Sequence, residues 1–600
     1  MLIALSVHLL FAFLPHFLPD ESFYVTIPYR LVNGDRLVQD EWHLSQFSSF
    51  FTYLPVSLWI KLNGSADGLI IFLRLVYLAI HTAAATIVYQ LFRTHKNWAV
   101  AAALIYYLQT PYKIYAISYN SMFAFFLLLF CACLYLIHRN NSKKLCYFAG
   151  VCFAACCIGN PVFLVTLLLY PVLWFITKVH THTEGPEHTG PQSEQENCRV
   201  PAKTGQAESY RCFFCRQTMG WFALGIVSVA VTGLLFFFGT GGTISSIFSN
   251  LGAILDSSEY NLMSGGAFSK IERISLVINY LTLRRPHYIL LLFVVMLIDT
   301  ERKRNSHRLL YLLAVIPLSV LCIFGMRFSP KIDHTLLQSF PCALLSIVCY
   351  ILTENRNKPL FACMWCPCAA AALINLFTSN TLLSSVGFVL AVSNVAGVIF
   401  AHDLFQELRS ANQTEKKTAP EHTKRPLVQR ASRFAICTVL ILQMLFYLYI
   451  IQFGQPIPHS PAIVSDGPYA GMMMNREQKE YYNASLRDLD LLQNRSSEDD
   501  PVLIVSYQSW MYLHLQRPIA TYTAWYDAHL DENALNTYYK LSPEKIPKYI
   551  YVVYSDNMDP IGLHIDNVQR CINTIDQMFD YTTEALNNGL LLTVTDYHGN

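Results

Sequence analysis

Apolar runs that are long enough to cross a lipid bilayer, or nearly so, follow one another through the first three quarters of this 600-residue chain. A helix needs about 20 mostly apolar residues to span the hydrocarbon core. Only 14% of the residues are charged and the mean hydropathy is +0.32, whereas soluble domains carry about 25% charged residues. We therefore expect an all-α polytopic membrane protein with about thirteen spans, at 2–18, 69–92, 98–110, 114–137, 145–158, 161–178, 219–239, 287–299, 308–325, 335–353, 360–377, 381–401 and 434–453.

The distribution of Lys and Arg predicts how these spans are oriented. If the N-terminus lies inside and the loops alternate, the inner loops and their edges hold 23 Lys and Arg, and the outer loops of residues 1–453 hold 10. Basic residues resist translocation, so the asymmetry favours thirteen spans with the C-terminus outside. Two polar inner segments, 179–218 and 402–424, are expected to be disordered. The single CxxC at 212–215 is weak evidence for zinc.

The chain changes character after residue 453. Residues 454–600 contain 19 Asp and Glu against 9 Lys and Arg, and their apolar runs are too short to span a membrane. We expect this part to be a small extracytoplasmic α/β domain, separate from a transmembrane domain at 1–453. Its predicted strands are 502–507, 549–555 and 590–596, and its predicted helices are 478–494 and 565–588.

The first outer loop, at 19–68, is rich in acidic side chains. The stretch FLPDESFYVTIPYRLVNGDRLVQDEWHLSQF begins it. Asp20 and Glu21 are predicted at the very end of the first helix, where Pro19 breaks it. A pair of acids beside a helix end is often no more than a solvated flank, but the aromatic and Pro-containing residues that follow form a particular order.

That order carries a resemblance to a known family. Five features follow one another along the chain. They are a helix, Asp-Glu, an amphipathic segment ending in Asn-Gly-Asp, the aromatic stretch DEWHLSQFSSFFTYLPVSLWIKLNG and an Arg-containing second helix, LIIFLRL. This arrangement resembles membrane glycosyltransferases of the GT-C superfamily, in particular bacterial relatives of the protein O-mannosyltransferases and the lipid A aminoarabinose transferase. The resemblance is strongest over residues 1–130, and thirteen helices with an outer C-terminal domain fit one branch of the superfamily.

The resemblance implies transfer of a sugar from a polyprenyl-phosphate carrier to an acceptor on the outer face of a bacterial cell (inner) membrane. By position, Asp20 matches the general base that takes a proton from the acceptor, and Glu21 matches its companion. Inversion at the sugar carbon is also implied. A carboxylate half-withdrawn at a membrane edge should have a raised pKa, which makes it a better base near neutral pH. The acceptor can be a lipid, a glycan or a protein.

The departing polyprenyl phosphate needs cations near the outer headgroups. The candidates for binding the donor phosphate are Arg284 and Arg285 in LTLRRPHY and Arg327 and Lys331 in MRFSPKIDH. Arg74 lies several residues inside the second apolar run, where a guanidinium is costly unless it is paired or faces a cavity. Two roles stay open for Arg74: an ion pair with an acid of the first loop, or contact with the donor phosphate.

Further polar residues of the outer loops are candidates for contacts with substrate. Asp40, Glu41 and His43 lie in the first loop, and Asp256 and Glu259 lie in a loop at 240–286 whose glycines suit a mobile lid. Asp40, Glu41 and His43 could form a divalent metal site with Asp333 and His334. Because no D-x-D motif accompanies Asp20, no metal ligand is assigned, and a divalent metal cofactor stays possible.

Two other functions compete with glycosyl transfer. A flippase or transporter of lipid-linked glycan would need polar groups and broken helices near the middle of the membrane. A glycan polymerase would rely on a late outer loop with arginines. Nucleic acid is excluded as a partner, since no basic aromatic groove or zinc-finger spacing is present. Most cysteines lie in apolar runs and are interpreted as packing residues.

Overall fold

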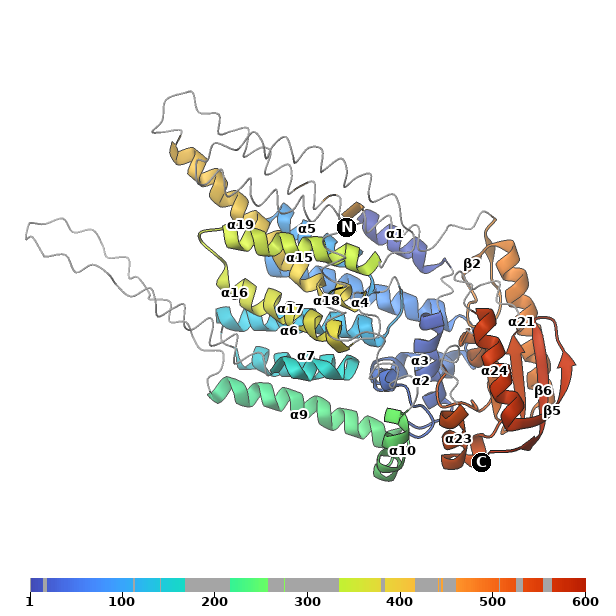
Figure 1. Ribbon diagram of the computed structural model, residues 1–600. Coiled ribbons are helices and arrows are strands. Elements are labelled where there is room, and N and C mark those ends of the chain that lie inside the picture. The colour runs from blue at the N-terminus through green and yellow to red at the C-terminus, as the bar shows by residue number, and fades with distance from the viewer. Residues whose placement is uncertain are drawn as a thin grey trace, which may run out of the picture.

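The computed structural model of the chain consists of an apolar helical part joined to a C-terminal domain built around a sheet (Figure 1). Apart from a few single positions, the residues that it describes are 2–14, 19–111, 114–140, 142–167, 216–256, 334–378, 384–415, 460–506, 508–524, 532–553 and 564–599.

The helical part contains long apolar helices that run side by side (Figure 1). Within the described residues, four stretches are long and apolar enough to cross a membrane: Leu69–His95, Tyr119–Asn140, Thr218–Gly239 and Lys358–Phe377. The helices are α1 (Leu2–Ala12), α4 (Leu69–Phe92), α5 (Asn97–Leu108), α6 (Tyr119–Asn140), α7 (Lys143–Gly159), α9 (Arg216–Gly239), α15 (His334–Leu352), α16 (Lys358–Leu360), α17 (Cys366–Thr378), α18 (Ser384–Val389) and α19 (Ala391–Glu415), with short turns η2 (Arg93–His95), η4 (Pro161–Val165) and η5 (Phe361–Trp365).

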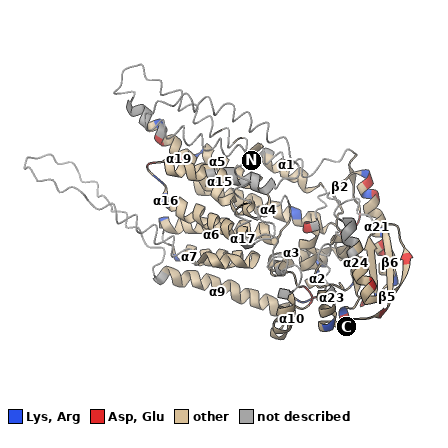
Figure 2. Ribbon diagram, in the orientation of Figure 1, with Lys and Arg blue, Asp and Glu red and all other residues tan. Residues whose placement is uncertain are grey.

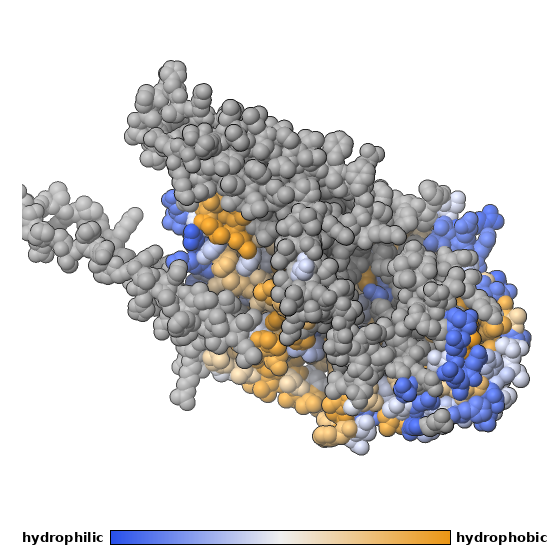
Figure 3. All heavy atoms as spheres, viewed as in Figure 1, coloured by the Kyte–Doolittle hydropathy of each residue, from blue (hydrophilic) through white to orange (hydrophobic). Residues whose placement is uncertain are grey.

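Apolar surface and charge are distributed as expected for a membrane protein. Charged residues are sparse along α6, α7 and α9 and gather on the C-terminal domain (Figure 2). In the space-filling view, hydrophobic residues cover the side formed by α9 and α10 (Ile244–Asp256), and hydrophilic residues cover the C-terminal domain (Figure 3). Leu224, Val227, Val231 and Leu235 of α9 are exposed, so this face of α9 is suited to lipid.

Helices α7 and α9 approach each other closely at two glycines. A Cβ atom on Gly150 would lie 2.0 Å from the Phe222 carbonyl oxygen, and one on Gly225 would lie 2.2 Å from the Tyr147 carbonyl oxygen. Small residues allow the backbones of membrane helices to come this near, and dispersion contacts then hold the pair together.

Several predicted spans differ from the observed helices. The run 2–18 is interrupted, because α1 ends at Ala12 and a new helix begins at Pro19. Helix α19 continues to Glu415, so the prediction of disorder from residue 402 onward was wrong for 402–415. The runs at 287–299 and 308–325 lie outside the described residues, as do most of 434–453 and the segment 179–215. The count of thirteen spans stays a prediction.

The first outer loop is largely helical. It contains α2 (Pro19–Val32), η1 (Leu44–Ser48) and α3 (Ser49–Asn63). Leu54, Leu58 and Leu62 follow one another at a spacing of four residues on α3 and are 74%, 50% and 74% exposed. This apolar stripe on a short helix between two spans is typical of a helix that lies in the membrane interface.

The C-terminal domain has a four-stranded sheet in the order β3-β4-β6-β5, in which only β3 and β4 are parallel. The predicted strands at 502–507, 549–555 and 590–596 are confirmed as β3, β4 and β6. The elements are β1 (Ala462–Ile463), β2 (Met473–Met474), α21 (Arg476–Arg495), β3 (Val502–Val505), α22 (Trp510–Leu515), α23 (Glu532–Leu541), η6 (Pro543–Lys545), β4 (Tyr549–Val553), α24 (His564–Met578), β5 (Phe579–Ala585) and β6 (Gly589–Tyr597).

The predicted helix at 565–588 was wrong in its second half. Helix α24 ends at Met578, and the next seven residues form β5, which pairs with β6. The sequence FDYTTEA combines aromatic and β-branched residues, which favour a strand once a partner strand is available. Asn587 and Asn588 close the hairpin by donating to the Asp488 carboxylate of α21.

The helical part and the C-terminal domain share two hydrophobic cores. One core joins α1, α2 and α4 to Tyr469, Tyr482 and Trp510, and the other joins the first outer loop to α23 and the sheet. Residues far apart in sequence are therefore buried together where the membrane helices meet the domain, which is also where Asp20 lies.

Candidate active site

Helix α2 places Asp20 and Glu21 in its own first turn. This corrects the expectation that both acids end the first helix. Proline is well suited to the first position of a helix, because its missing N–H would be unbonded there and its φ is already helical. The start of a helix also stabilises negative charge.

Glu21 is committed to a buried ion pair with Arg74 of α4. Arg74 Nε donates to Glu21 Oε1 at 2.6 Å, and Arg74 Nη2 donates to Glu21 Oε2 at 2.5 Å. Both side chains are only 1% exposed. Two parallel N–H···O bonds of this kind fix direction as well as distance.

The same guanidinium also binds the end of α1. Arg74 Nη1 donates to the carbonyl oxygens of Ala12, at 3.0 Å, and Leu14, at 2.5 Å. The last carbonyls of a helix have no partner within the helix, and Arg74 supplies one. One side chain thus joins α1, α2 and α4, and it fixes the backbone that carries Asp20.

Asp20 itself is half-buried, whereas its neighbour Glu21 is fully buried. Adjacent positions of a helix point about 100° apart, so the two carboxylates face different surroundings. The structure contains the ion pair between Arg74 and an acid of the first loop, which was one of the two roles predicted for Arg74. The phosphate-binding role of Arg74 stays a prediction, although four of its N–H donors already have partners.

A second buried charge cluster fixes the chain that follows α2. Arg30 Nε donates to Asp35 Oδ2 at 2.7 Å, and Arg30 Nη1 donates to Glu41 Oε2 at 2.8 Å. Lys545 of the C-terminal domain lies 2.5 Å from Asp35 Oδ1. Burial acts to raise the pKa of Asp35, but Arg30 and Lys545 outweigh it and hold this pKa below its usual range.

The loop at 33–48 docks on the C-terminal domain through this cluster. Arg30 Nη2 donates to the Thr521 carbonyl at 2.9 Å, and the Trp42 amide donates to the Tyr522 carbonyl at 2.7 Å. The Trp42 ring packs against the rings of Tyr522 and Tyr538. The acids of this loop therefore hold two parts of the molecule together.

Asp40, Glu41 and His43 were predicted as possible substrate contacts. Asp40 Oδ2 accepts from the Arg36 amide at 2.8 Å, and its Oδ1 atom has no hydrogen-bond partner among the described residues. Glu41 is bound to Arg30. His43 Nδ1 accepts from the Ser45 amide at 3.0 Å, and its ring packs edge-on against Phe23.

The metal site considered for these three residues is not among the potential metal clusters of the described chain. Those clusters are His95, His402 and Asp403, and Asp580, Asp596 and His598. Asp333 and the side chain of His334 lie outside the described part.

The remaining predicted residues cannot be placed. Arg284, Arg285, Arg327, Lys331 and Glu259 lie outside the described residues, as does the side chain of Asp256. Asp256 itself ends helix α10 (Ile244–Asp256). This helix occupies the start of the expected lid at 240–286, and Asn250 Nδ2 donates to the Val38 carbonyl at 3.0 Å. The described start of the lid is thus a helix docked on the first loop.

Sequence reasoning singled out Arg74 but missed Tyr77 and His81, which extend a polar stripe along α4. Arg74, Tyr77 and His81 recur at a helical spacing and are all buried. His8 of α1 stacks on Tyr107, with ring centres 4.6 Å apart, and faces His81 at 6.2 Å. Neither ring nitrogen of His8 has a hydrogen-bond partner within the described chain. The spacing of the polar residues in the run 69–92 was the available signal.

Comparison with known proteins finds similar solved structures. No family model and no curated protein matches the sequence. The crystal structure of ArnT from Cupriavidus metallidurans bound to undecaprenyl phosphate is similar, with a TM-score of 0.48 and 10% sequence identity. The match covers 98% of this chain and 96% of that one.

Proposed function

We propose that this protein is an integral-membrane glycosyltransferase of the GT-C type. It transfers a sugar from a polyprenyl-phosphate carrier to an acceptor on the outer face of the membrane, with Asp20 as the general base and with inversion. The observation that carries this proposal is the difference between two adjacent acids. Glu21 is locked to Arg74 in a buried ion pair, while Asp20 is half-buried where the apolar helices meet the C-terminal domain.

The two acids have different tasks in this proposal. The acceptor O–H or N–H attacks the anomeric carbon, the bond from that carbon to the phosphate oxygen breaks, and Asp20 takes the acceptor's proton. The polyprenyl phosphate leaves with its negative charge, which Arg284 and Arg285, or Arg327 and Lys331, stabilise. Glu21 is a positioning residue, because both of its carboxylate oxygens already accept from Arg74.

The position of the site agrees with chemistry at a membrane surface. Helix α4 begins against the C-terminal domain, where the Gly68 amide donates to the Gly467 carbonyl at 3.0 Å. Asp20 lies at this end of the bundle, beside the interfacial helix α3. A lipid-linked donor can stay in the bilayer while its sugar reaches Asp20, and a bacterial cell membrane supplies such donors.

The test is transfer of radiolabelled sugar from a panel of polyprenyl-phosphate donors in membranes that contain the full chain. We expect Asp20→Asn to lower the transfer rate by about 10²–10⁴-fold, the usual contribution of a general base. Asp67→Asn is the matched control, because Asp67 is an exposed acid of the same loop and should keep the wild-type rate.

Two outcomes would contradict the proposal at different levels. Normal turnover by Asp20→Asn would remove the assignment of the base. A well-inserted wild type that transfers from no donor would favour the second candidate, a flippase for lipid-linked glycan.

One observation favours the flippase: His81 lies at the middle of α4 and is buried with His8, so polar groups do occur at membrane depth. Movement of a fluorescent lipid-linked sugar across vesicles would identify it.

A further inference from the structure

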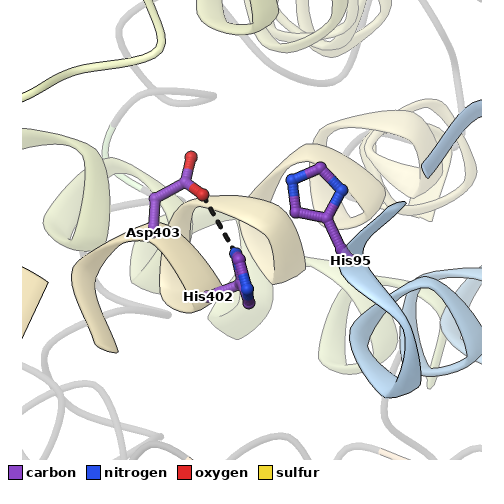
Figure 4. Close-up of side chains that lie close together, drawn as sticks. All are labelled: His95, His402 and Asp403. Atoms are coloured by element: carbon purple, nitrogen blue, oxygen red, sulfur yellow. Dashed lines mark hydrogen bonds and ion pairs between the residues drawn. The ribbon is translucent and has the colours of Figure 1, made fainter. Parts of the chain in front are cut away.

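A group of metal-ligand side chains lies at the end of the helical bundle that is remote from Asp20. His95 belongs to the turn η2 after α4, and His402 and Asp403 belong to α19 (Figure 4). Helix α4 has 24 residues, so η2 lies about 36 Å from the start of α4 beside the C-terminal domain. Each of the three side chains offers one ligand atom, and these atoms lie within 4.8 Å of one another.

The hydrogen bonds of the two imidazoles indicate which ring nitrogens carry a proton. His402 Nδ1 lies 3.0 Å from Asp403 Oδ1, which can only accept, so Nδ1 carries the proton. His402 Nε2 lies 3.3 Å from the Gln406 amide nitrogen, which donates to it. His95 Nδ1 lies 3.2 Å from the Phe92 carbonyl oxygen and donates in the same way. His95 Nε2 therefore keeps its lone pair for a metal, and His402 Nε2 becomes available once the exposed Gln406 amide turns away from it.

This pattern is the one that supports metal-binding histidines. Ligating imidazoles usually donate their other N–H to a carboxylate or a backbone carbonyl, which fixes the ring and raises its basicity. Here Asp403 accepts the Nδ1–H of His402, and the Phe92 carbonyl accepts the Nδ1–H of His95.

The surroundings also suit a bound ion. The side chains of His402 and Asp403 are 16% and 24% exposed, so an ion can enter without being freely solvated. Trp98 packs against both His402 and Phe405 and forms an apolar wall beside the site. The rings of His95 and His402 meet edge-on, with centres 4.8 Å apart.

The backbone of the turn provides an independent sign of constraint. Lys96, directly after His95, has a φ of 52° and a ψ of −118°. It is one of three residues other than glycine with positive φ in the described chain. Such a conformation is costly and persists only when the surrounding structure imposes it. Here it turns the chain sharply from α4 into α5 and leaves His95 against α19.

We propose that His95, His402 and Asp403 bind a divalent transition metal ion such as Zn²⁺, which clamps the α4–α5 turn to α19. Two imidazoles and one carboxylate select a borderline ion over Mg²⁺ or Ca²⁺, which prefer oxygen ligands. Ligand atoms around a tetrahedral zinc lie about 3.4 Å apart. Small side-chain rotations close the set around the ion, with water completing the coordination.

The experiment uses the purified full chain in detergent, stripped with chelator and then titrated with Zn²⁺ by calorimetry. We expect His95→Ala and His402→Ala each to lose one equivalent of bound zinc relative to wild type. Asp403→Asn removes a ligand oxygen and the acceptor of the His402 Nδ1–H, so it should bind this equivalent at least about 10-fold more weakly than wild type. His598→Ala is the matched control, since it alters the exposed second cluster and should leave this equivalent in place.

A measurement on the wild type guards against variants that fail to fold. Co²⁺ bound to nitrogen and oxygen ligands gives visible d–d bands without a thiolate charge-transfer band, which separates this site from the CxxC at 212–215. Such bands, lost in His95→Ala, support the proposal. Equal zinc stoichiometry and affinity in wild type and the His95→Ala/His402→Ala variant, or a thiolate band alone, would overturn it.

Discussion

The Arg74 guanidinium joins three segments of the chain with one side chain. It binds Glu21 of α2 with two hydrogen bonds, and it binds the carbonyls of Ala12, which ends α1, and of Leu14. A buried charge that loses its partner costs about 3–5 kcal/mol. At the residue scale, the geometry of Asp20 therefore depends on a pair that does not itself take part in the chemistry.

We expect Arg74→Ala to destabilise the protein by about 3–5 kcal/mol, because it leaves the Glu21 carboxylate buried without its cation. Glu21→Gln should cost less, since the amide oxygen can still accept from Arg74 Nε. Thermal unfolding in detergent measures both effects, and Arg93→Ala, at an exposed arginine beyond the same helix, is the control. Equal stability of Arg74→Ala and wild type would show that the pair does not hold these segments.

The Asp35 cluster predicts a pH dependence with a definite sign. The folded-state pKa of Asp35 lies below its ordinary value of 3.8 because Arg30 and Lys545 outweigh burial. A carboxyl group whose pKa is lower in the folded state than in the unfolded state stabilises the fold. This stabilisation is fully present above the unfolded-state pKa, and it is lost as the pH falls through the folded-state pKa. We expect Asp35→Asn to be less stable than wild type at pH 7 and at pH 5 by the same amount. The difference should shrink only below about pH 4, and narrowing between pH 7 and 5 would contradict this origin.

Some of these residues could be predicted and others could not. Arg74 was expected either to pair with an acid of the first loop or to contact the donor phosphate, because a guanidinium in an apolar run requires a partner or a cavity. The structure pairs it with Glu21. The contact between Asp35 and Lys545 joins residues that are 510 positions apart. No local pattern marks such a pair, so the docking of the first loop on the C-terminal domain was not predicted.

At the scale of elements, hydrophobic periodicity identified the long helices and the buried strands, and it failed at their ends. The runs 69–92 and 219–239 coincide with α4 and with the apolar part of α9. Helix α19 continues into polar sequence because length and packing extend a helix beyond its apolar part. Strand β5 was mistaken for helix because its partner β6 comes later in the chain, and strand pairing decides such segments.

The contact between α7 and α9 can be tested with two glycines of one helix. Gly225→Ala places a Cβ 2.2 Å from the Tyr147 carbonyl oxygen, whereas the Cβ of Gly233→Ala meets no atom within 4 Å. We expect Gly225→Ala to destabilise the protein by about 1–3 kcal/mol through overpacking. Gly233→Ala should be neutral or slightly stabilising, since alanine favours helix. Thermal unfolding in detergent measures the stability of both variants. Equal changes in stability for Gly225→Ala and Gly233→Ala would argue against close packing at Gly225.

At the scale of the whole molecule, the arrangement follows from charge and burial together. The C-terminal domain shares two hydrophobic cores with α1, α2, α4 and the first outer loop. It must therefore lie on the same side of the membrane as Asp20. The segment at 354–358, between α15 and η5, is predicted on the other side, where the basic loops gather.

Accessibility of single cysteines tests this orientation, in a full chain whose native cysteines have been replaced. Ser465 in the C-terminal domain and Asn355 in the short loop after α15 are both exposed, so each can be exchanged with little effect on packing. We expect Ser465→Cys to react with a membrane-impermeant maleimide in intact cells, and Asn355→Cys to react only after the membrane is permeabilised. The reverse result would place Asp20 on the inner face, where an outer acceptor cannot reach it, and the direction of the proposed transfer would have to be inverted.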